Sequence, residues 1–194
     1  MAKIQAMQFQ HDTAVVSRKQ FEDHIFLYNG YVTKTNEATE MLTHNPEYST
    51  ANATGGHYRG WKKTETYAID GVILHELYFQ NLITTSTPIG PKTLHLLEQN
   101  FGSTDNWKQC FTACATSARG WCVLAYEQRT GTCRNFLLDA HDNGNIAMYY
   151  PIIVLDMYEH AYFLDYGKDK ATYINSFITN IPWDVIEKRV GAII

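Results

Sequence analysis

The sequence predicts an α+β protein, in which an N-terminal antiparallel helical hairpin is followed by an α/β lobe with a small three-stranded antiparallel sheet. Three observations favour this class. Two long helical patterns occupy the first part of the chain, a segment dense in turn-forming residues follows them, and patterns typical of strands occur only beyond it. We therefore expect two domains, an α-hairpin domain at residues 1–88 and an α/β domain at residues 89–194.

The hairpin is predicted from apolar and aromatic residues that recur at intervals of three, four and seven. One such pattern runs along residues 14–42 and a second along residues 62–82. Residues 43–60 contain an Asn-Pro pair, a Gly-Gly pair and several Ser and Thr residues, so we expect a connection there. Residues 84–91 form the clearest linker, because they are rich in turn formers and lack periodicity.

The second domain mixes helices and strands. An apolar segment at residues 120–127, a turn at Arg129-Thr130-Gly131 and a partner segment at residues 132–140 indicate a strand hairpin. In chain order we expect helices at 91–100 and 103–118, strands at 120–127, 132–140 and 152–157, and helices at 170–178 and 183–190.

Composition limits the classes of function. With 45% hydrophobic residues, the 194-residue chain can bury a sizeable core. A net charge of −4 argues against nucleic acid as the main partner, because phosphate binding needs a concentrated cationic surface. No apolar run approaches the ~20 residues of a membrane span, and the N-terminus lacks the apolar core of a secretory signal. We expect a cytoplasmic protein with no membrane partner.

The four cysteines include no C-x-x-C pair, and we interpret them as reduced, mostly buried thiols. They are Cys110, Cys114, Cys122 and Cys133. Cys110 and Cys114 would share one helix face, so a metal or redox pair remains an alternative for these two.

The most informative stretch is Asp156-Met-Tyr-Glu-His160, at the end of the apolar third strand. A carboxylate and an imidazole four residues apart can bind one metal ion together. Imidazole and carboxylate ligands suit iron, manganese or zinc better than the metals that prefer thiolates.

This stretch resembles the Asp-x-Trp-Glu-His-Ala-Tyr-Tyr signature of the iron/manganese superoxide dismutase family, with Tyr158 at the Trp position. Segments similar to other motifs of that family follow the family's order at residues 71–81, 101–111, 117–121, 173–177 and 181–184.

The resemblance implies a centre in which three imidazoles and one carboxylate hold one iron or manganese ion per subunit. The residues at these positions are His24, His75, Asp156 and His160. The implied reaction is the disproportionation of superoxide to dioxygen and hydrogen peroxide. The resemblance leaves the choice between iron and manganese open.

Further roles around the ion come from the same resemblance. Tyr31 is the candidate substrate gate, and it lies seven residues after His24, which is only about 20° short of two helical turns. His141 takes the position of a family Gln that hydrogen-bonds solvent on the metal, because Gly71 at the alternative position has no side chain. Trp121 is expected to wall the active site.

Three residues of the signature region bear on subunit contact and on the site wall. Glu159 matches a family residue that reaches across a two-fold axis to the partner's ligand His, so we expect a homodimer or a dimer of dimers. Phe163 replaces a family Tyr of a cross-subunit link, and Tyr158 replaces a Trp. Both changes are expected to affect proton delivery or the shape of the wall.

Because the net charge does not favour an anionic substrate, attraction of superoxide would need a local cationic funnel. The candidates are Lys34, Arg59, Lys62 and Lys63, although an ordinary exposed face explains each of them equally well.

Two other functions stay open. The alternatives to a superoxide dismutase are a non-catalytic metal-binding member of the same fold and a non-haem iron oxygenase with two histidines and one carboxylate. Four ligand positions in place of three argue against the oxygenase.

Overall fold

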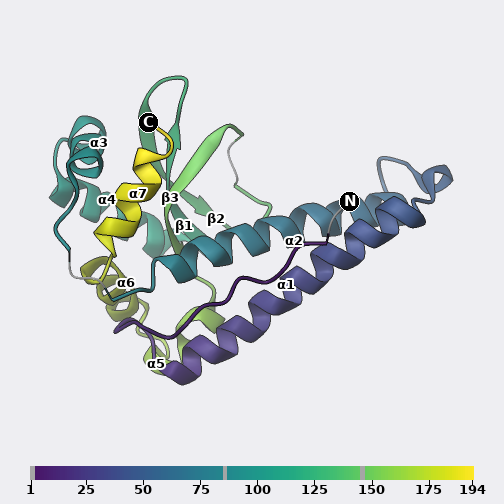
Figure 1. Ribbon diagram of the computed structural model, residues 1–194, viewed down its shortest axis with the longest axis horizontal. Helices are drawn as coiled ribbons and strands as arrows, with labels where there is room; N and C mark the ends of the chain where they lie inside the picture. Colours follow the sequence, from purple (N-terminus) through teal and green to yellow (C-terminus); the bar gives the residue numbers. More distant parts are fainter. Residues whose placement is uncertain (1–2, 85–86, 145–146) are drawn as a thin grey trace.

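The computed structural model describes residues 3–84, 87–144 and 147–194. Figure 1 shows the two long helices α1 (Arg18–His44) and α2 (His57–Gln80) side by side and antiparallel, with the α/β lobe against one end of the pair. The predicted α+β class is confirmed. The predicted linker at 84–91 falls partly outside the described residues, at 85 and 86, and the domain boundary at 88/89 stays a prediction.

The starts of both hairpin helices differ from the predicted starts for local reasons. The hydroxyl of Ser17 accepts a hydrogen bond from the backbone N–H of Gln20, so α1 begins at residue 18 and not at 14. α2 begins five residues before the predicted residue 62, because Gly56 adopts a positive φ of 91° ahead of it. A Cβ at Gly56 would lie 2.0 Å from the carbonyl oxygen of Thr50, so no other residue fits this turn.

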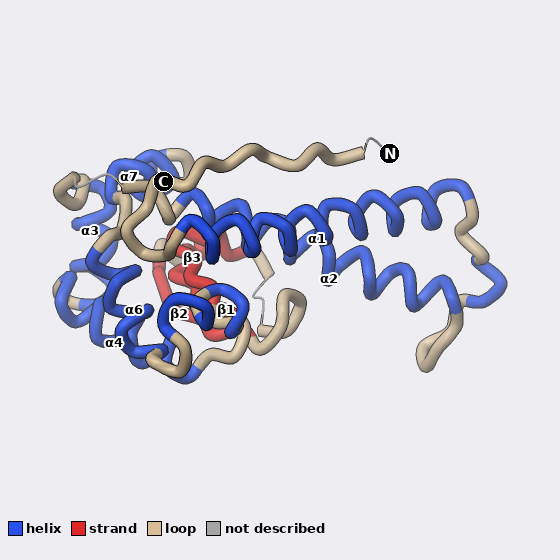
Figure 2. Tube along the Cα trace, turned by 90° about the horizontal axis from the view of Figure 1, so that it is seen from below, coloured by secondary structure: helices blue, strands red, loops and turns tan. Residues whose placement is uncertain are grey.

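Aromatic side chains fill the space between the two hairpin helices. Tyr28 of α1 and Phe79 of α2 are buried, and the ring of Phe9 packs against both. Phe9 belongs to an extended N-terminal segment that runs along the hairpin (Figure 2), where Ile4 exchanges two hydrogen bonds with Asn36. The segment therefore adds a third layer to the hairpin core.

The sheet has the order β2-β1-β3, with both pairs antiparallel. Its strands are β1 (Trp121–Glu127), β2 (Thr132–Leu138) and β3 (Tyr149–Asp156). All residues of the central strand β1 are buried. In the register, Trp121 pairs with Asp156 on one side and with Leu138 on the other. The predicted wall residue and the predicted carboxylate ligand are therefore neighbours across the sheet.

Helices cover the sheet on both sides (Figure 2). α2 packs against β3, α4 packs against β1 and β2, and α7 packs against β3. The remaining elements of this lobe are α3 (Pro91–Phe101), α4 (Thr104–Ser117), α5 (Phe163–Tyr166), α6 (Lys170–Thr179) and α7 (Trp183–Gly191). In the parts of the chain that the structure describes, no helix combines the length and the apolar character needed to cross a membrane.

Polar side chains fasten the end of α2 to the sheet. Asn81 donates a hydrogen bond of 2.8 Å to the carbonyl of Val154 in β3. Arg189 of α7 donates to the carbonyl of Ile152 and to the side chain of Asn81. These bonds fix the position of α2 relative to β3, and the two elements each supply one side chain to the site described next.

Candidate metal centre

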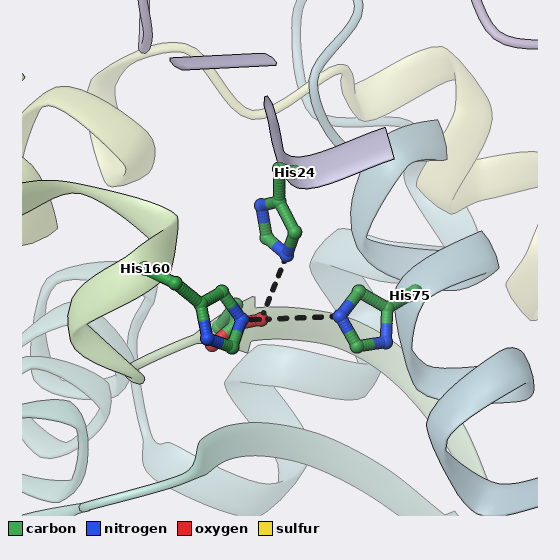
Figure 3. A group of neighbouring side chains, drawn as sticks. His24, His75 and His160 are labelled. Carbon is green, nitrogen blue, oxygen red and sulfur yellow. Dashed lines mark ion pairs between the residues drawn. The ribbon is translucent and has the colours of Figure 1, made fainter. Parts of the chain in front are cut away.

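Four side chains from four elements of the fold converge at one point. His24 lies in α1, His75 in α2, Asp156 at the end of β3, and His160 in the short 3₁₀ turn Glu159–Ala161. Figure 3 shows the three imidazoles pointing toward a common centre. The Nε2 atoms of His24, His160 and His75 lie 3.2, 3.3 and 3.7 Å from Oδ2 of Asp156.

This arrangement fits a metal ion. The four converging atoms all lie within 4.8 Å of one another. Each of them is buried and makes no hydrogen bond among the described residues. An ion about 2.0–2.2 Å from each ligand needs ligand-to-ligand distances of roughly 3 to 4 Å, which matches the observed spacing. Buried polar atoms without partners are rare in native proteins, so this cluster calls for an ion.

Burial affects the protonation of three of these side chains. It lowers the pKa of His75 to about 3, with a further contribution from neighbouring His24, and it also lowers the pKa of His24. Burial alone would raise the pKa of Asp156, but the close imidazoles of His160 and His24 outweigh it and keep the pKa below its ordinary value. Neutral imidazoles and an ionised carboxylate are the forms that bind metal.

Hydrogen bonds orient two of the three histidines. Nδ1 of His75 lies 2.6 Å from the carbonyl oxygen of Gly71, which can only accept, so Nδ1 carries the proton and Nε2 faces the centre. Gln20 donates to the carbonyl of His160 at 2.5 Å and accepts from the backbone N–H of Leu164. This buried Gln joins α1 to the turn that carries His160.

The carboxylate of Asp156 is also held in place. Its Oδ1 accepts a hydrogen bond of 2.9 Å from the backbone N–H of Tyr158, which leaves Oδ2 for the centre. The hydroxyl of Tyr173 donates to the backbone carbonyl of Asp156 and lies 3.0 Å from the hydroxyl of Tyr78 in α2. The end of β3 is thereby tied to both α6 and α2.

The three predicted neighbours of the ion gather around His75. The indole N–H of Trp121 donates to Nδ1 of His141 at 2.9 Å. The ring centroids of Tyr31 and Trp121 lie 5.1 and 4.9 Å from that of His75. Tyr31 and His141 are in edge contact, with centroids 4.7 Å apart. These predicted residues therefore form one connected wall.

Sequence reasoning missed two residues of this environment, Tyr67 and Gln20. The ring centroid of Tyr67 lies 4.5 Å from that of His141 and 6.1 Å from that of Tyr31. The available signal was spacing, because Tyr67 lies eight residues before His75 on the same helix and Gln20 lies four residues before His24 on another. Burial raises the pKa of Tyr31 well above its ordinary value, and contact with Tyr67 adds to the shift.

Two other predicted residues lie at the surface. Glu159 is exposed, and Phe163 is 53% exposed. Tyr158 instead lines the site, with its ring stacked on His160 at a centroid distance of 5.2 Å. Two lysines of the expected cationic funnel carry acidic partners, since Lys34 pairs with Glu37 and Lys62 pairs with Glu65.

A buried site of three imidazoles and one carboxylate, built across a helical hairpin and a small sheet, defines a metal-binding protein of the α+β class. Comparison with known proteins gives the family. Residues 89–189 match the model for the C-terminal domain of iron/manganese superoxide dismutases. The chain is 37% identical over 178 residues to an iron superoxide dismutase of Aquifex pyrophilus, which covers 90% of this chain and 84% of the relative.

A manganese enzyme is similar to the chain as well. The chain is 35% identical over 168 residues to manganese superoxide dismutase 1 of Halobacterium salinarum, which covers 84% of this chain and 80% of the relative. The chain therefore belongs to the iron/manganese superoxide dismutase family.

The wall formed by Tyr31, Trp121 and His141 requires that residue 71 have no side chain. A Cβ there would lie 3.0 Å from the ring of Tyr31 and 3.3 Å from Cδ2 of His141. Substitution Gly71→Ala should therefore displace these rings. It should not give the increase of about 0.4–1 kcal/mol in the free energy of unfolding that Ala brings at an unstrained helical Gly. Gly60 of the same helix has nothing within 4 Å of the corresponding Cβ position, so Gly60→Ala is the matched control and should be stabilising. Chemical unfolding measures both; equal stabilisation by the two substitutions would contradict the packing described.

Proposed function

We propose that the chain is a superoxide dismutase that uses one iron or manganese ion held by His24, His75, Asp156 and His160. The convergence of four buried, unpartnered ligand atoms carries this proposal. Membership of the family supports it, since similar proteins include both iron and manganese superoxide dismutases. Iron and manganese are both compatible with this donor set.

The ligand charges suit an anionic substrate. A bound iron or manganese ion supplies the one-electron redox chemistry by which superoxide becomes dioxygen or hydrogen peroxide. Asp156 contributes one negative charge and the three imidazoles contribute none. The centre therefore stays cationic and favours superoxide locally, although the whole chain carries −4.

His141 is the proposed hydrogen-bond donor toward the centre. The indole of Trp121 can only donate, so Nδ1 of His141 is the acceptor in their hydrogen bond. Burial lowers the pKa of His141 to about 4, so the ring is neutral at physiological pH. A neutral ring that accepts at Nδ1 carries its proton on Nε2. This nitrogen can then donate, as the amide of a Gln would.

Tyr31 is the proposed substrate gate. Its ring contacts both His75 and His141, so this side chain is the part of the wall that lies against a proposed ligand and the proposed donor together. Trp121 and Tyr158 are proposed to exclude water from the rest of the site. The substitution of Tyr at residue 158 for the family's Trp brings a hydroxyl into this wall.

The two other functions are weakened by different observations. A non-haem iron oxygenase leaves metal positions open for a co-substrate, whereas four protein ligands converge here. A non-catalytic member of the family would keep the ligands and lack turnover, and only an assay separates it from the enzyme.

The direct test is reconstitution. The protein is stripped of metal and reloaded separately with iron and with manganese, and each preparation is assayed for superoxide dismutation with the metal content measured by elemental analysis. We expect activity in proportion to bound metal for at least one of the two. Stoichiometric metal without activity in either preparation would identify a non-catalytic relative.

The ligand assignment is tested by removal of single ligands. His75→Ala and Asp156→Ala should each weaken metal binding by more than the roughly 10–100-fold that loss of an outer hydrogen-bond partner costs. The control is His95→Ala, because His95 is exposed in α3. Metal titration of each variant gives the affinity. An unchanged affinity in either ligand variant would remove that residue from the centre.

We also propose a cytoplasmic homodimer in which Glu159 reaches the partner subunit. Glu159 is exposed, and the large apolar side chains of Phe163 and Leu164 just after it are 53% and 58% exposed, as expected for a surface that a partner covers. Association of two such dimers is the further alternative.

The dimer is tested at Glu159. Loss of one partner of a buried charged pair costs roughly 2–5 kcal/mol, so Glu159→Ala should weaken association by about thirtyfold or more. Analytical ultracentrifugation over a range of protein concentrations measures this change. Glu98→Ala, an exposed Glu on α3, is the matched control. A wild-type monomer, or the same dissociation constant in both variants, would refute the proposed contact.

A further inference from the structure

Three of the four cysteines line one pocket. It lies between α4 and the edge strand β2 and has a volume of about 500 Å³. Cys110 and Cys114 face it from α4, and Cys133 faces it from β2. The side chain of Asn135 also lines the pocket, and both of its polar atoms are buried without a hydrogen-bond partner among the described residues. The pocket thus brings thiols and an unpartnered amide together in a space that admits a small polar molecule.

The cysteine beside Cys114 is Cys122 of β1, and not Cys110 one helical turn earlier. The side chains of Cys114 and Cys122 are in contact, and each affects the pKa of the other. Sγ of Cys122 also lies 3.7 Å from the carbonyl oxygen of Phe111, in the turn of α4 that precedes Cys114. Cys122 therefore points from the central strand β1 into α4 beside Cys114. Cys114 is partly exposed, whereas Cys122 is fully buried.

We propose that hydrogen peroxide oxidises Cys114 and Cys122 to an intramolecular disulfide, with Cys114 as the thiol that meets the oxidant in the pocket. This modification goes beyond dismutation, and it rests on the proposed function only for the origin of the peroxide.

The oxidation proceeds in two steps, first at Cys114 and then at Cys122. The thiolate of Cys114 attacks one oxygen of the peroxide, so an S–O bond forms, the O–O bond breaks, and hydroxide leaves and takes up a proton. The sulfur of Cys122 then attacks the sulfenic sulfur, so the S–S bond forms and the S–O bond breaks. The oxygen leaves as water with the proton of Cys122. Two thiols and one peroxide thus give one disulfide and two waters.

The surroundings favour Cys114 as the reacting thiol. Thiolate, and not thiol, is the nucleophile, and contact with Cys122 lowers the pKa of Cys114. Burial raises the pKa of Cys133 to about 12, which disfavours its thiolate form. The ammonium group of Lys170 donates to the carbonyls of Thr116 and Ala118 and places a positive charge at this end of α4. That charge opposes only part of the effect of burial, which raises the pKa of Cys122, so Cys114 and not Cys122 is the thiol that ionises first.

A metal site is not the better explanation for these cysteines. Among the described residues, the cysteines do not form a group that could hold a metal ion, whereas His24, His75, Asp156 and His160 do. Two sulfurs in contact support thiol–disulfide chemistry.

The test uses the metal-loaded, full-length protein and a small molar excess of added hydrogen peroxide. After alkylation and digestion, mass spectrometry should find a peptide in which Cys114 is joined to Cys122, and dithiothreitol should remove it. Two reactive thiols per chain should be lost, and Cys114 should react roughly tenfold or more faster than Cys133. Absence of the joined peptide, or a bond between Cys110 and Cys114, would overturn the proposal.

Three variants sharpen the result. Cys114→Ser should abolish the bond and leave Cys122 unmodified. Cys122→Ala should stop the reaction at a sulfenic acid on Cys114, which dimedone captures. Cys110→Ser is the control, since this exposed cysteine lines the same pocket and its removal should leave the bond unchanged. If Cys122→Ala does not fold, the Cys114→Ser variant tests the assignment, because Cys114 is partly exposed and its replacement disturbs the core less. A disulfide that forms on Cys122 in the Cys114→Ser variant would refute the assignment.

The dismutase assay is run separately on the same preparations. Because the peroxide is added, an inactive protein that forms the bond would support this proposal and contradict the proposed function. An active protein that does not form the bond would support the proposed function and contradict this proposal.

Discussion

The structure depends on one fully buried carboxylate. Asp156 is 0% exposed, and a charge removed from water in this way costs several kcal/mol unless neighbouring groups compensate for it. One oxygen is satisfied by the backbone N–H of Tyr158. The other faces three imidazole nitrogens and has no hydrogen-bond partner among the described residues. A cation at that point satisfies all four atoms together, so folding and metal binding favour the same arrangement.

This requirement explains why polar side chains join elements that are distant in the sequence. The centre needs ligands from α1, α2 and β3 at fixed separations, and apolar packing alone tolerates small sliding of helices. Gln20 ties α1 to the His160 turn, and Asn81 ties the end of α2 to β3. Tyr173 ties α6 to the backbone of Asp156. Each is a directional bond at a place where displacement would misplace a ligand.

Local signals in the sequence predicted most of the fold. Apolar periodicity located both hairpin helices, and the strand hairpin followed from the turn at Arg129 to Gly131. The helix starts were wrong where the decisive signal was a cap or a backbone angle, as at Ser17 and Gly56. Periodicity carries no information about these, because they depend on a single hydrogen bond or a single φ.

The site was predictable to a different extent. The pairing of Asp156 with His160 follows from spacing within one segment, whereas His24 and His75 were identified as ligands through the family resemblance. Gln20 and Tyr67 were missed because an amide or a phenol on a helical stripe has many possible environments, and only the three-dimensional contacts select one. The pairing of Cys114 with Cys122 was missed for a similar reason, since it joins a helix to a strand.

The central strand β1 separates two kinds of chemistry by the alternation of its side chains. Trp121 contacts His75 of the metal centre, and the next residue, Cys122, points into α4 beside Cys114. Successive strand residues face opposite sides, so a register shift of one residue would exchange the two faces and bring a thiol against the metal ligands. The antiparallel partners on both sides of β1 thus keep a sulfur ligand out of a nitrogen and oxygen centre. The donor set of the candidate centre therefore depends on correct strand pairing as well as on the four side chains themselves.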